Sequence, residues 1–153
     1  MRLLSYLLDG EARYGAAVAG GVVDLTRRIG RDFSDVKALI AANALADAQE
    51  VIADQQPDYA LDDLVLLPPV LAPEKLWCIG VNYAERNAEY KDNSDLPKYP
   101  SLFVRSMSSM TGAGQPLEKP KVSDQLDYEG ELVIVIGRGG RHIPREKAWA
   151  HIF

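Results

Sequence analysis

Asp127-Tyr128-Glu129-Gly130-Glu131-Leu132-Val133-Ile134-Val135-Ile136 joins two glutamates directly to a run of five aliphatic residues. Four of the five are β-branched, and β-branched residues fit the pleated, half-buried surface of a sheet. An uninterrupted aliphatic run of this length is also typical of a strand inside a core. The sequence therefore predicts a strand over residues 128–136 with a buried second half.

Glu129 and Glu131 are one residue apart, so on a strand both side chains lie on the same face. Two neighbouring carboxylates repel one another unless something neutralises them, and a hard divalent cation does so well. The alternative is an edge strand with two solvated acids, and spacing alone favours it. The apolar run that follows favours a metal site instead, because it indicates a buried setting.

The first quarter of the chain predicts a small β-meander. Strands are expected over residues 3–8, 12–18 and 22–25, with hairpin turns at Asp9-Gly10 and Gly20-Gly21. Apolar residues then recur at helical spacing over residues 33–53, and Asn43 divides this region into two helices. The proline-rich stretch of residues 64–73 marks a boundary. We expect a small α+β domain over residues 1–70 and a larger domain that begins at residue 71.

The second half predicts a strand–turn–helix followed by a strand. Residues 75–81 indicate a buried strand that contains Cys78, and Asn82 can cap a short helix over residues 83–90. A second short strand is expected over residues 101–105. Pro144 suits the first position of a final helix. The lone cysteine has no evident histidine partner and is interpreted as an inert thiol.

The charged residues around these elements are only weak indicators of a functional site. Arg86 and Glu89 are three residues apart and can pair on one face of a helix. Arg105 offers a guanidinium that can bind a carboxylate through two hydrogen bonds, although an ordinary surface arginine is the more common case. The glycines between residues 137 and 140 lack the pattern of a phosphate loop and predict a turn. His142 is isolated and a poor candidate for a metal ligand.

Composition is that of an ordinary globular domain. The chain has 153 residues, 47% hydrophobic and 25% charged, with a net charge of −5. Nothing in this balance suggests a nucleic-acid partner or an anionic membrane surface. No targeting segment or membrane-spanning run is evident, so a cytoplasmic protein is expected. The apolar residues Trp149, Ile152 and Phe153 follow without a helix cap, which predicts a longer chain cut inside its main domain.

Four blocks of sequence, in order and spacing, resemble the fumarylacetoacetate hydrolase family. They are Ile79-Gly80-Val81-Asn82-Tyr83, Pro100-Ser101-Leu102-Phe103-Val104-Arg105, Ser109 with Gly112, and Asp127-Tyr128-Glu129-Gly130-Glu131-Leu132 with Val135-Ile136-Gly137-Arg138. The resemblance covers residues 76–153. The predicted N-terminal β-meander and the helices after it also resemble the small leading domain of bacterial members. It implies an α+β fold with a mixed β-roll or barrel-like main domain, incomplete here, in a homodimer.

The resemblance also implies a site. Glu129 and Glu131 match two glutamates that, with a later aspartate, bind Mg²⁺ or Mn²⁺ in the family. Tyr83, Arg105 and Ser109 would contact the substrate, a small 2-oxo acid or diketo acid. Family members hydrolyse carbon–carbon bonds in acylpyruvates or β-diketo acids, and relatives isomerise, decarboxylate or hydrate related oxo acids. Metal-dependent hydrolysis is therefore the expected activity.

One departure from the family pattern concerns the catalytic base. The hydrolases of the family carry a histidine three residues after the tyrosine that matches Tyr83, and a glutamate three residues further on. Here these positions are Arg86 and Glu89. Histidine can accept a proton from water near neutral pH, whereas arginine stays protonated. Three alternatives stay open: a different reaction on a 2-oxo acid, a non-catalytic binding protein, or a piece of chain that is inert when isolated.

Overall fold

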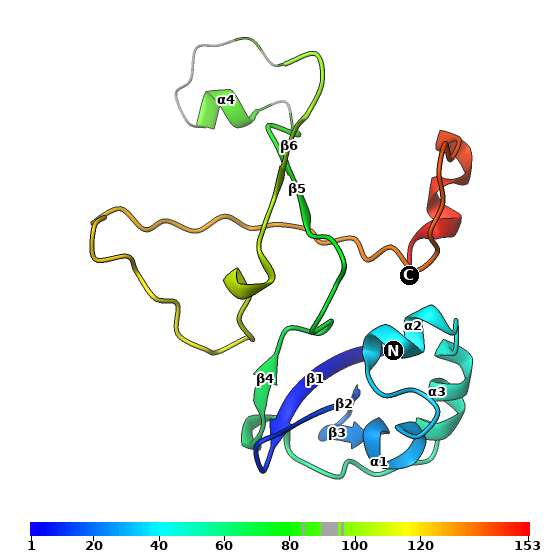
Figure 1. Cartoon of the computed structure of the whole chain (residues 1–153). Helices are drawn as coiled ribbons and strands as arrows, with labels where there is room; N and C mark the ends of the chain where they lie inside the picture. The colour runs from blue at the N-terminus through cyan, green and yellow to red at the C-terminus, as the bar shows by residue number, and fades with distance from the viewer. Residues whose placement is uncertain (84, 90–94, 96) are drawn as a thin grey trace. The chain divides into compact units, whose positions relative to one another are not determined.

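The computed structural model describes residues 1–83, 85–89, 95 and 97–153. The chain divides into two units, and Figure 1 labels the helices and strands of each. One contains Met1–Leu71 and Thr111–Phe153, and the other contains Ala72–Met110. Each unit is described below by itself. Both have mixed helix and strand content with antiparallel sheets.

The first unit is built on a four-stranded antiparallel sheet of order β3-β2-β1-β4. Its strands are β1 (Arg2–Leu8), β2 (Glu11–Val18), β3 (Gly21–Asp24) and β4 (Val65–Leu67). The β1–β2 hairpin turns at Asp9 and Gly10, whose φ angles are +52° and +82°. Positive φ at both central positions is the type I′ geometry that matches strand twist. The predicted β-meander is confirmed.

Three short helices follow β3 and cover the sheet: α1 (Leu25–Ile29), α2 (Val36–Ala41) and α3 (Leu45–Ile52). The division at Asn43 is confirmed, and this residue takes a left-handed φ of +53°. The predicted end of the third strand was wrong. Asp24 caps α1 by accepting a hydrogen bond from the Arg27 backbone N–H at 2.9 Å, so Leu25 begins a helix instead of ending a strand.

The main core lies between β2 and these helices. The Tyr14 hydroxyl donates to the Phe33 carbonyl oxygen at 2.7 Å, and this satisfies the only polar atom of a side chain that is otherwise buried. The buried members of this core are Tyr14, Ala16, Leu25, Val36, Leu39, Ile40, Ala44 and Ala48. An apolar cavity of about 290 Å³ opens beside α2, and Val135 and Phe153 contribute to its lining.

A cluster of charged side chains ties β2, β3 and α1 to the segment before β4. The fully buried Asp24 carboxylate lies 3.3 Å from the Arg13 guanidinium. The Asp24 backbone N–H donates to the Asp58 carboxylate at 2.8 Å, and Arg28 donates to Asp58 at 2.6 Å. Burial of Asp24 is thus compensated by a cap, an ion pair and neighbouring hydrogen bonds.

The hydrogen bonds that Asp58 accepts predict that the stability of the fold depends on pH. Hydrogen bonds from Arg28 hold the pKa of Asp58 below its usual value of 3.8, although partial burial opposes this. A lowered folded-state pKa adds stability above the unfolded pKa, and this stability is lost as pH falls through the folded-state value. We expect Asp58→Asn to reduce the free energy of unfolding by roughly 1–3 kcal/mol at neutral pH. In urea unfolding, the difference from wild type should begin to shrink below about pH 5 and should disappear only below the lowered folded-state pKa of Asp58.

The matched control for this prediction is Asp62→Asn, because Asp62 is exposed in a short 3₁₀ turn. Its effect should stay near zero across the whole pH range. A difference for Asp58→Asn that does not change with pH would show that the carboxylate charge is not what stabilises the fold.

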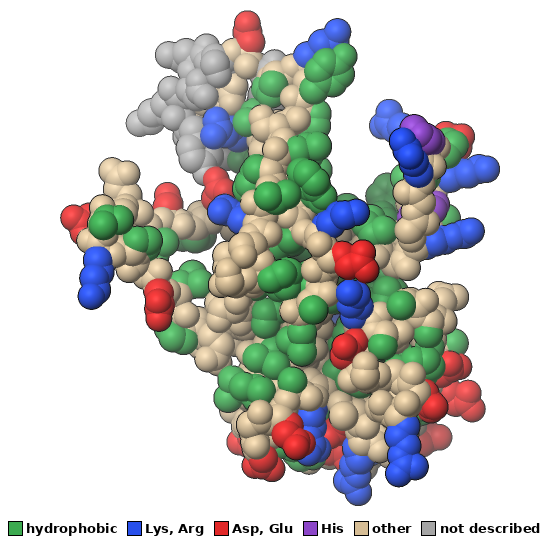
Figure 2. Space-filling view, in the orientation of Figure 1, with side chains coloured by type: hydrophobic (Ala, Val, Ile, Leu, Met, Phe, Trp, Pro, Cys, Tyr) green, Lys and Arg blue, Asp and Glu red, His purple; other side chains and the backbone are tan. Residues whose placement is uncertain are grey.

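The second unit contains a two-stranded antiparallel sheet of β5 (Trp77–Gly80) and β6 (Ser101–Val104), with α4 (Arg86–Glu89) between them in sequence. The two predicted strands are confirmed. A short helix lies within the predicted region, but it begins at Arg86, so Asn82 does not cap it. The predicted burial of β5 is wrong. Trp77 is 58% exposed and Ile79 is 47% exposed, because no other described element of this unit covers the sheet. Cys78 is half-buried. Figure 2 shows hydrophobic side chains gathered over these strands.

Residues 111–135 contain no strand, so the predicted strand over residues 128–136 is wrong for the described structure. Of the residues in the predicted strand, only Ile136 forms a β-bridge, and its partner is Ile152. The five aliphatic residues have the propensity for a strand but lack a neighbouring strand to complete a ladder. The helix predicted after Pro144 is a 3₁₀ helix, Arg145–His151. Within the described residues, neither sheet closes into a barrel.

No helix in the described part of the chain is both long and apolar enough to cross a membrane.

Candidate functional site

Glu129 and Glu131 lie in the extended stretch before Ile136, and both side chains are exposed. Gly130 between them faces open space, since a methyl group built on it would meet no atom within 4 Å. Two exposed carboxylates of this kind are hard oxygen donors, which Mg²⁺ accepts together with water and substrate oxygens. The donor chemistry of this pair fits the predicted metal. Among the described residues, no group of three or more acidic, histidine or cysteine side chains gathers as a metal site.

Tyr83 and Arg86 belong to the turn and helix that follow β5. The Arg86 backbone N–H donates to the Tyr83 carbonyl oxygen at 3.4 Å, which ties the helix start to the turn. The Arg86 side chain is half-buried and donates to the Asn87 amide oxygen at 3.4 Å. Glu89 is the last residue of α4, but its side chain lies outside the described structure, as does the predicted Arg86–Glu89 pair.

Arg105 directly follows β6. Its backbone N–H donates to the Leu76 carbonyl oxygen at 3.1 Å and extends the β5–β6 pairing by one step. Its guanidinium carbon lies 5.2 Å from the centre of the Phe103 ring, a cation–π arrangement that holds the side chain against the sheet. The arginine is therefore positioned by one backbone bond and one ring.

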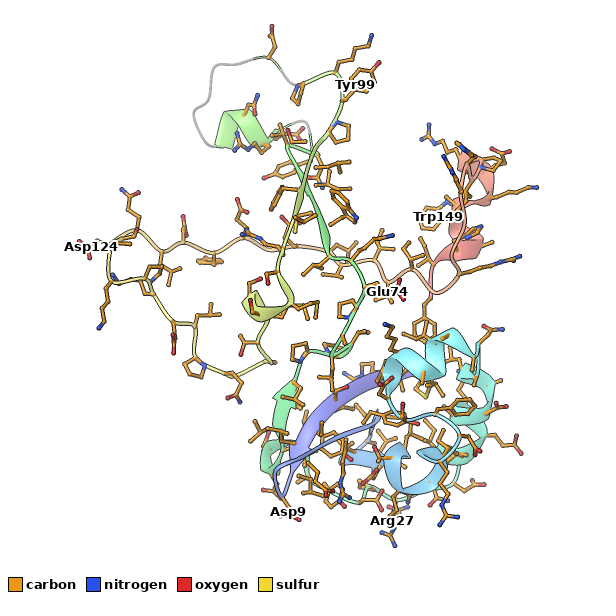
Figure 3. All side chains as sticks on the ribbon, in the orientation of Figure 1. Asp9, Arg27, Glu74, Tyr99, Asp124 and Trp149 are labelled. Atoms are coloured by element: carbon orange, nitrogen blue, oxygen red, sulfur yellow. The ribbon has the colours of Figure 1, made fainter. Side chains whose placement is uncertain are left out.

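A depression of about 200 Å³ lies beside Arg105, and Lys75 also lines it. Lys75 was missed by the sequence analysis. The strand register reveals it. Trp77 pairs with Val104, so the residues before β5 lie beside the residues after β6. Two cations on one depression favour an anionic ligand, although Glu74, which is labelled in Figure 3, lines the same depression.

Ser109 ends a short 3₁₀ helix, Met107–Ser109, that Ser106 caps. Its hydroxyl donates to the Ser106 carbonyl oxygen at 2.7 Å. A hydroxyl that donates to the backbone keeps its lone pairs as acceptors. Ser109 can therefore accept a hydrogen bond from a ligand in its present conformation.

The register of β5 and β6 separates the predicted substrate residues into two groups. Tyr83 and Arg86 follow Gly80, which pairs with Ser101 at one end of the sheet. Arg105 follows Val104, which pairs with Trp77 at the other end. Three residues of strand separate these ends by about 10 Å. Within this unit, the structure places Arg105 and Ser109 at one end of the sheet and Tyr83 and Arg86 at the other.

Comparison with known proteins gives these residues a family context. The family model described as Fumarylacetoacetate (FAA) hydrolase C-terminal matches residues 75–153, which is half of the chain. A solved fumarylacetoacetate hydrolase from Exiguobacterium antarcticum is 33% identical, with a TM-score of 0.75 over 99% of this chain and 52% of that chain. A solved putative HpcE protein from Mycobacterium smegmatis is 27% identical, with a TM-score of 0.70 over 97% of this chain and 51% of that chain.

Curated relatives point to the same family. Oxaloacetate tautomerase YisK of Bacillus subtilis is 39% identical over 97 residues, 62% of this chain and 32% of that protein. Oxaloacetate tautomerase Fahd2a of Rattus norvegicus, a mitochondrial protein, is 32% identical over 161 residues, 99% of this chain and 50% of that protein. The chain thus spans about a third to a half of the length of these relatives. From the match over residues 75–153, the chain belongs to the fumarylacetoacetate hydrolase family.

Proposed function

We propose that the protein is a metal-dependent enzyme that interconverts the keto and enol forms of a small 2-oxo acid. Arg86 is the observation that carries this proposal, because it occupies the position at which the hydrolases of the family carry a histidine. Curated relatives named oxaloacetate tautomerases support the isomerase alternative over the carbon–carbon hydrolysis that the sequence put first. Tautomerisation moves one proton and needs no activated water, so it does not require the missing histidine.

Glu129 and Glu131 would hold Mg²⁺ or Mn²⁺, with the remaining positions filled by water and substrate oxygens. The bound ion would supply positive charge that stabilises the enolate oxygen. The open space at Gly130 supports this assignment, since it leaves room for a ligand to approach the backbone between the two carboxylates.

The other predicted residues would bind and orient the substrate. Arg105, with Lys75 beside it, would bind a substrate carboxylate. Glu89 would accept the proton from the carbon next to the 2-oxo group. It would then donate this proton to the enolate oxygen, which gives the enol. Tyr83 and Ser109 would contribute hydrogen bonds to substrate oxygens.

Hydrolysis of acylpyruvates or β-diketo acids is the second candidate. It is favoured by the family model over residues 75–153 and by the solved hydrolase that is 33% identical. Both reactions pass through the enolate of a 2-oxo acid. Tautomerisation forms it by removing a proton from the intact substrate, whereas hydrolysis adds an activated water to the acyl carbonyl and releases it when the carbon–carbon bond breaks. The residue at position 86 should decide between them.

We therefore predict opposite responses to Arg86→His. The wild-type protein should interconvert oxaloacetate tautomers and hydrolyse acylpyruvates poorly. The substitution should raise acylpyruvate hydrolysis on the order of 100-fold, the lower end of what a positioned base contributes. The two activities are followed separately, by enol absorbance and by release of pyruvate. Arg86→Lys keeps the charge and serves as the control.

Fast acylpyruvate hydrolysis by the wild-type protein would contradict the tautomerase assignment in favour of hydrolysis. Absence of both activities in wild type and variants, with metal bound, would favour a non-catalytic binding protein.

Three further assignments belong to this proposal. We assign residues 1–70 to a small α+β domain and residues 71–153 to the N-terminal part of a catalytic domain of the mixed β-roll type. The protein works as a homodimer in the cytoplasm. The four-stranded sheet, whose last strand ends at Leu67, supports the first domain, and the match from residue 75 supports the second.

A further inference from the structure

The chain leaves the first unit after Leu71 and returns to it at Thr111. Both junctions are held beside β4, the edge strand of the four-stranded sheet (Figure 1). On the outgoing side, the buried Ser5 hydroxyl donates to the Pro69 carbonyl oxygen at 2.8 Å. On the returning side, Gly112 lies directly against the β4 backbone. The segment with the predicted substrate residues therefore begins and ends close to points that the first sheet holds.

Gly112 is held by close packing against backbone atoms. A methyl group on it would overlap the Leu66 carbonyl group and would lie 2.9 Å from the Leu67 Cα. Both residues belong to a strand that is paired with β1, so their backbone atoms cannot move aside as a flexible side chain can. The φ angle of Gly112 is not positive, so lack of space is what requires glycine here. Among residues 101–140, all of which the structure describes, Gly112 alone is buried.

The chain between Gly112 and Ser109 is short, since three residues span at most about 10 Å. Ser109 lies on a single 3₁₀ turn, which the Met110 N–H closes by donating to the Met107 carbonyl oxygen at 3.2 Å. Met107, at the start of this turn, lines the depression beside Arg105. A displacement of Gly112 would therefore reach a turn that carries both Ser109 and part of the lining of that depression.

We propose that Gly112 is a positioning residue, whose contact with β4 holds the turn that presents Ser109 to the substrate. This inference rests on the proposed function, because it takes Ser109 as a substrate contact. None of the predicted site residues belongs to the four-stranded sheet. The sheet nevertheless contributes to substrate binding, because it anchors the chain three residues after Ser109.

The first test is amide hydrogen exchange without substrate, followed by mass spectrometry on peptides that cover residues 106–111. Gly112→Ala should push the returning chain away from β4 and loosen the turn. Exchange of these amides should then rise roughly fivefold, the effect of losing about one hydrogen bond. Gly139→Ala is the matched control, because its φ is not positive and a methyl group there would meet no atom within 4 Å. Equal exchange in wild type and both variants overturns the proposal.

The second test is a double-mutant cycle in the tautomerase assay. Ser109→Ala should raise KM roughly tenfold, since it removes one hydrogen bond to the substrate. Gly112→Ala should raise KM by a similar factor and leave kcat unchanged. The double variant should keep the roughly tenfold rise of either single variant, because Gly112 acts through Ser109. A rise of roughly 100-fold, the product of two independent effects, overturns the proposal.

A glycine inserted between Met110 and Thr111 decides the matter if Gly112→Ala fails to fold by circular dichroism. The insertion leaves Gly112 against β4 but lengthens its connection to Ser109, so it should raise both the exchange rate and KM. The same insertion after Gly139 should change neither, and no change from the insertion after Met110 overturns the proposal.

The exchange experiment keeps this inference separate from the proposed function, since it needs neither substrate nor activity. A wild-type KM for Ser109→Ala would contradict the proposed role of Ser109 in substrate binding. Faster exchange in Gly112→Ala would still show that the contact with β4 holds the turn, and unchanged exchange would overturn that as well.

Discussion

Replacing both Glu129 and Glu131 by glutamine is expected to lower catalytic activity by roughly 1000-fold or more and to abolish Mg²⁺ binding. A bound divalent ion stabilises developing negative charge by several kcal/mol, and about 4 kcal/mol corresponds to three powers of ten in rate. Glutamine keeps the length and polarity of each side chain but removes the charge that holds the ion. Calorimetric titration with Mg²⁺ and the tautomerase assay give the two readouts.

Glu118→Gln is the matched control for this experiment. Glu118 is an exposed glutamate of the same unit, outside the candidate site. Its substitution removes the same charge and should change neither readout. The metal assignment would be wrong if the double variant kept both Mg²⁺ binding and activity. Loss of activity with intact metal binding would move the ligands elsewhere and leave Glu129 and Glu131 a role in substrate contact.

The largest expected effect on stability is that of Asp24→Ala, at about 2–4 kcal/mol. The substitution removes the cap of α1 and leaves the Arg13 guanidinium without its buried partner. It also leaves a cavity, since the Asp24 side chain is fully buried. A loss of this size is a large share of the stability of a small domain. Urea unfolding monitored by circular dichroism measures it directly.

Glu50→Ala provides the comparison, because Glu50 is exposed on α3 and its loss should cost less than about 0.5 kcal/mol. Equal effects of the two substitutions would mean that the charged cluster around Asp24 adds no stability. A large effect of Asp24→Ala that persists when Arg13 is also replaced by alanine would assign the loss to the helix cap and the cavity.

Features that depend on a few adjacent residues were predictable from the sequence. The Asp9-Gly10 turn and the break at Asn43 both rest on the tolerance of these residues for positive φ. Helix α1 carried a local signal too, since aspartate is a preferred N-cap, but the apolar run of β3 concealed it. The conformation of each of these elements is determined by residues only a few positions away in the sequence.

Features that need a distant partner were not predictable. Leu132–Ile136 has the residues of a buried strand, yet a strand exists only when another strand supplies its hydrogen bonds. The exposure of Trp77 has a different distant cause, since β5 has its partner strand β6 but no other described element of this unit covers their sheet. In the candidate site, the residue types of Glu129, Glu131 and Arg105 were evident from sequence. The depression shared by Arg105 and Lys75 required the register of β5 with β6.

β4 is the last strand of the first sheet in the sequence, and this has a consequence for the order of folding during synthesis. All four strands of the first sheet lie between Arg2 and Leu67, so the sheet can be completed while the rest of the chain is still being made. The apolar cavity beside α2 is lined partly by Val135 and Phe153, which leave the ribosome later. Until they do, the apolar cavity beside α2 lacks this part of its lining. A chaperone that binds apolar surface could bind the nascent chain there.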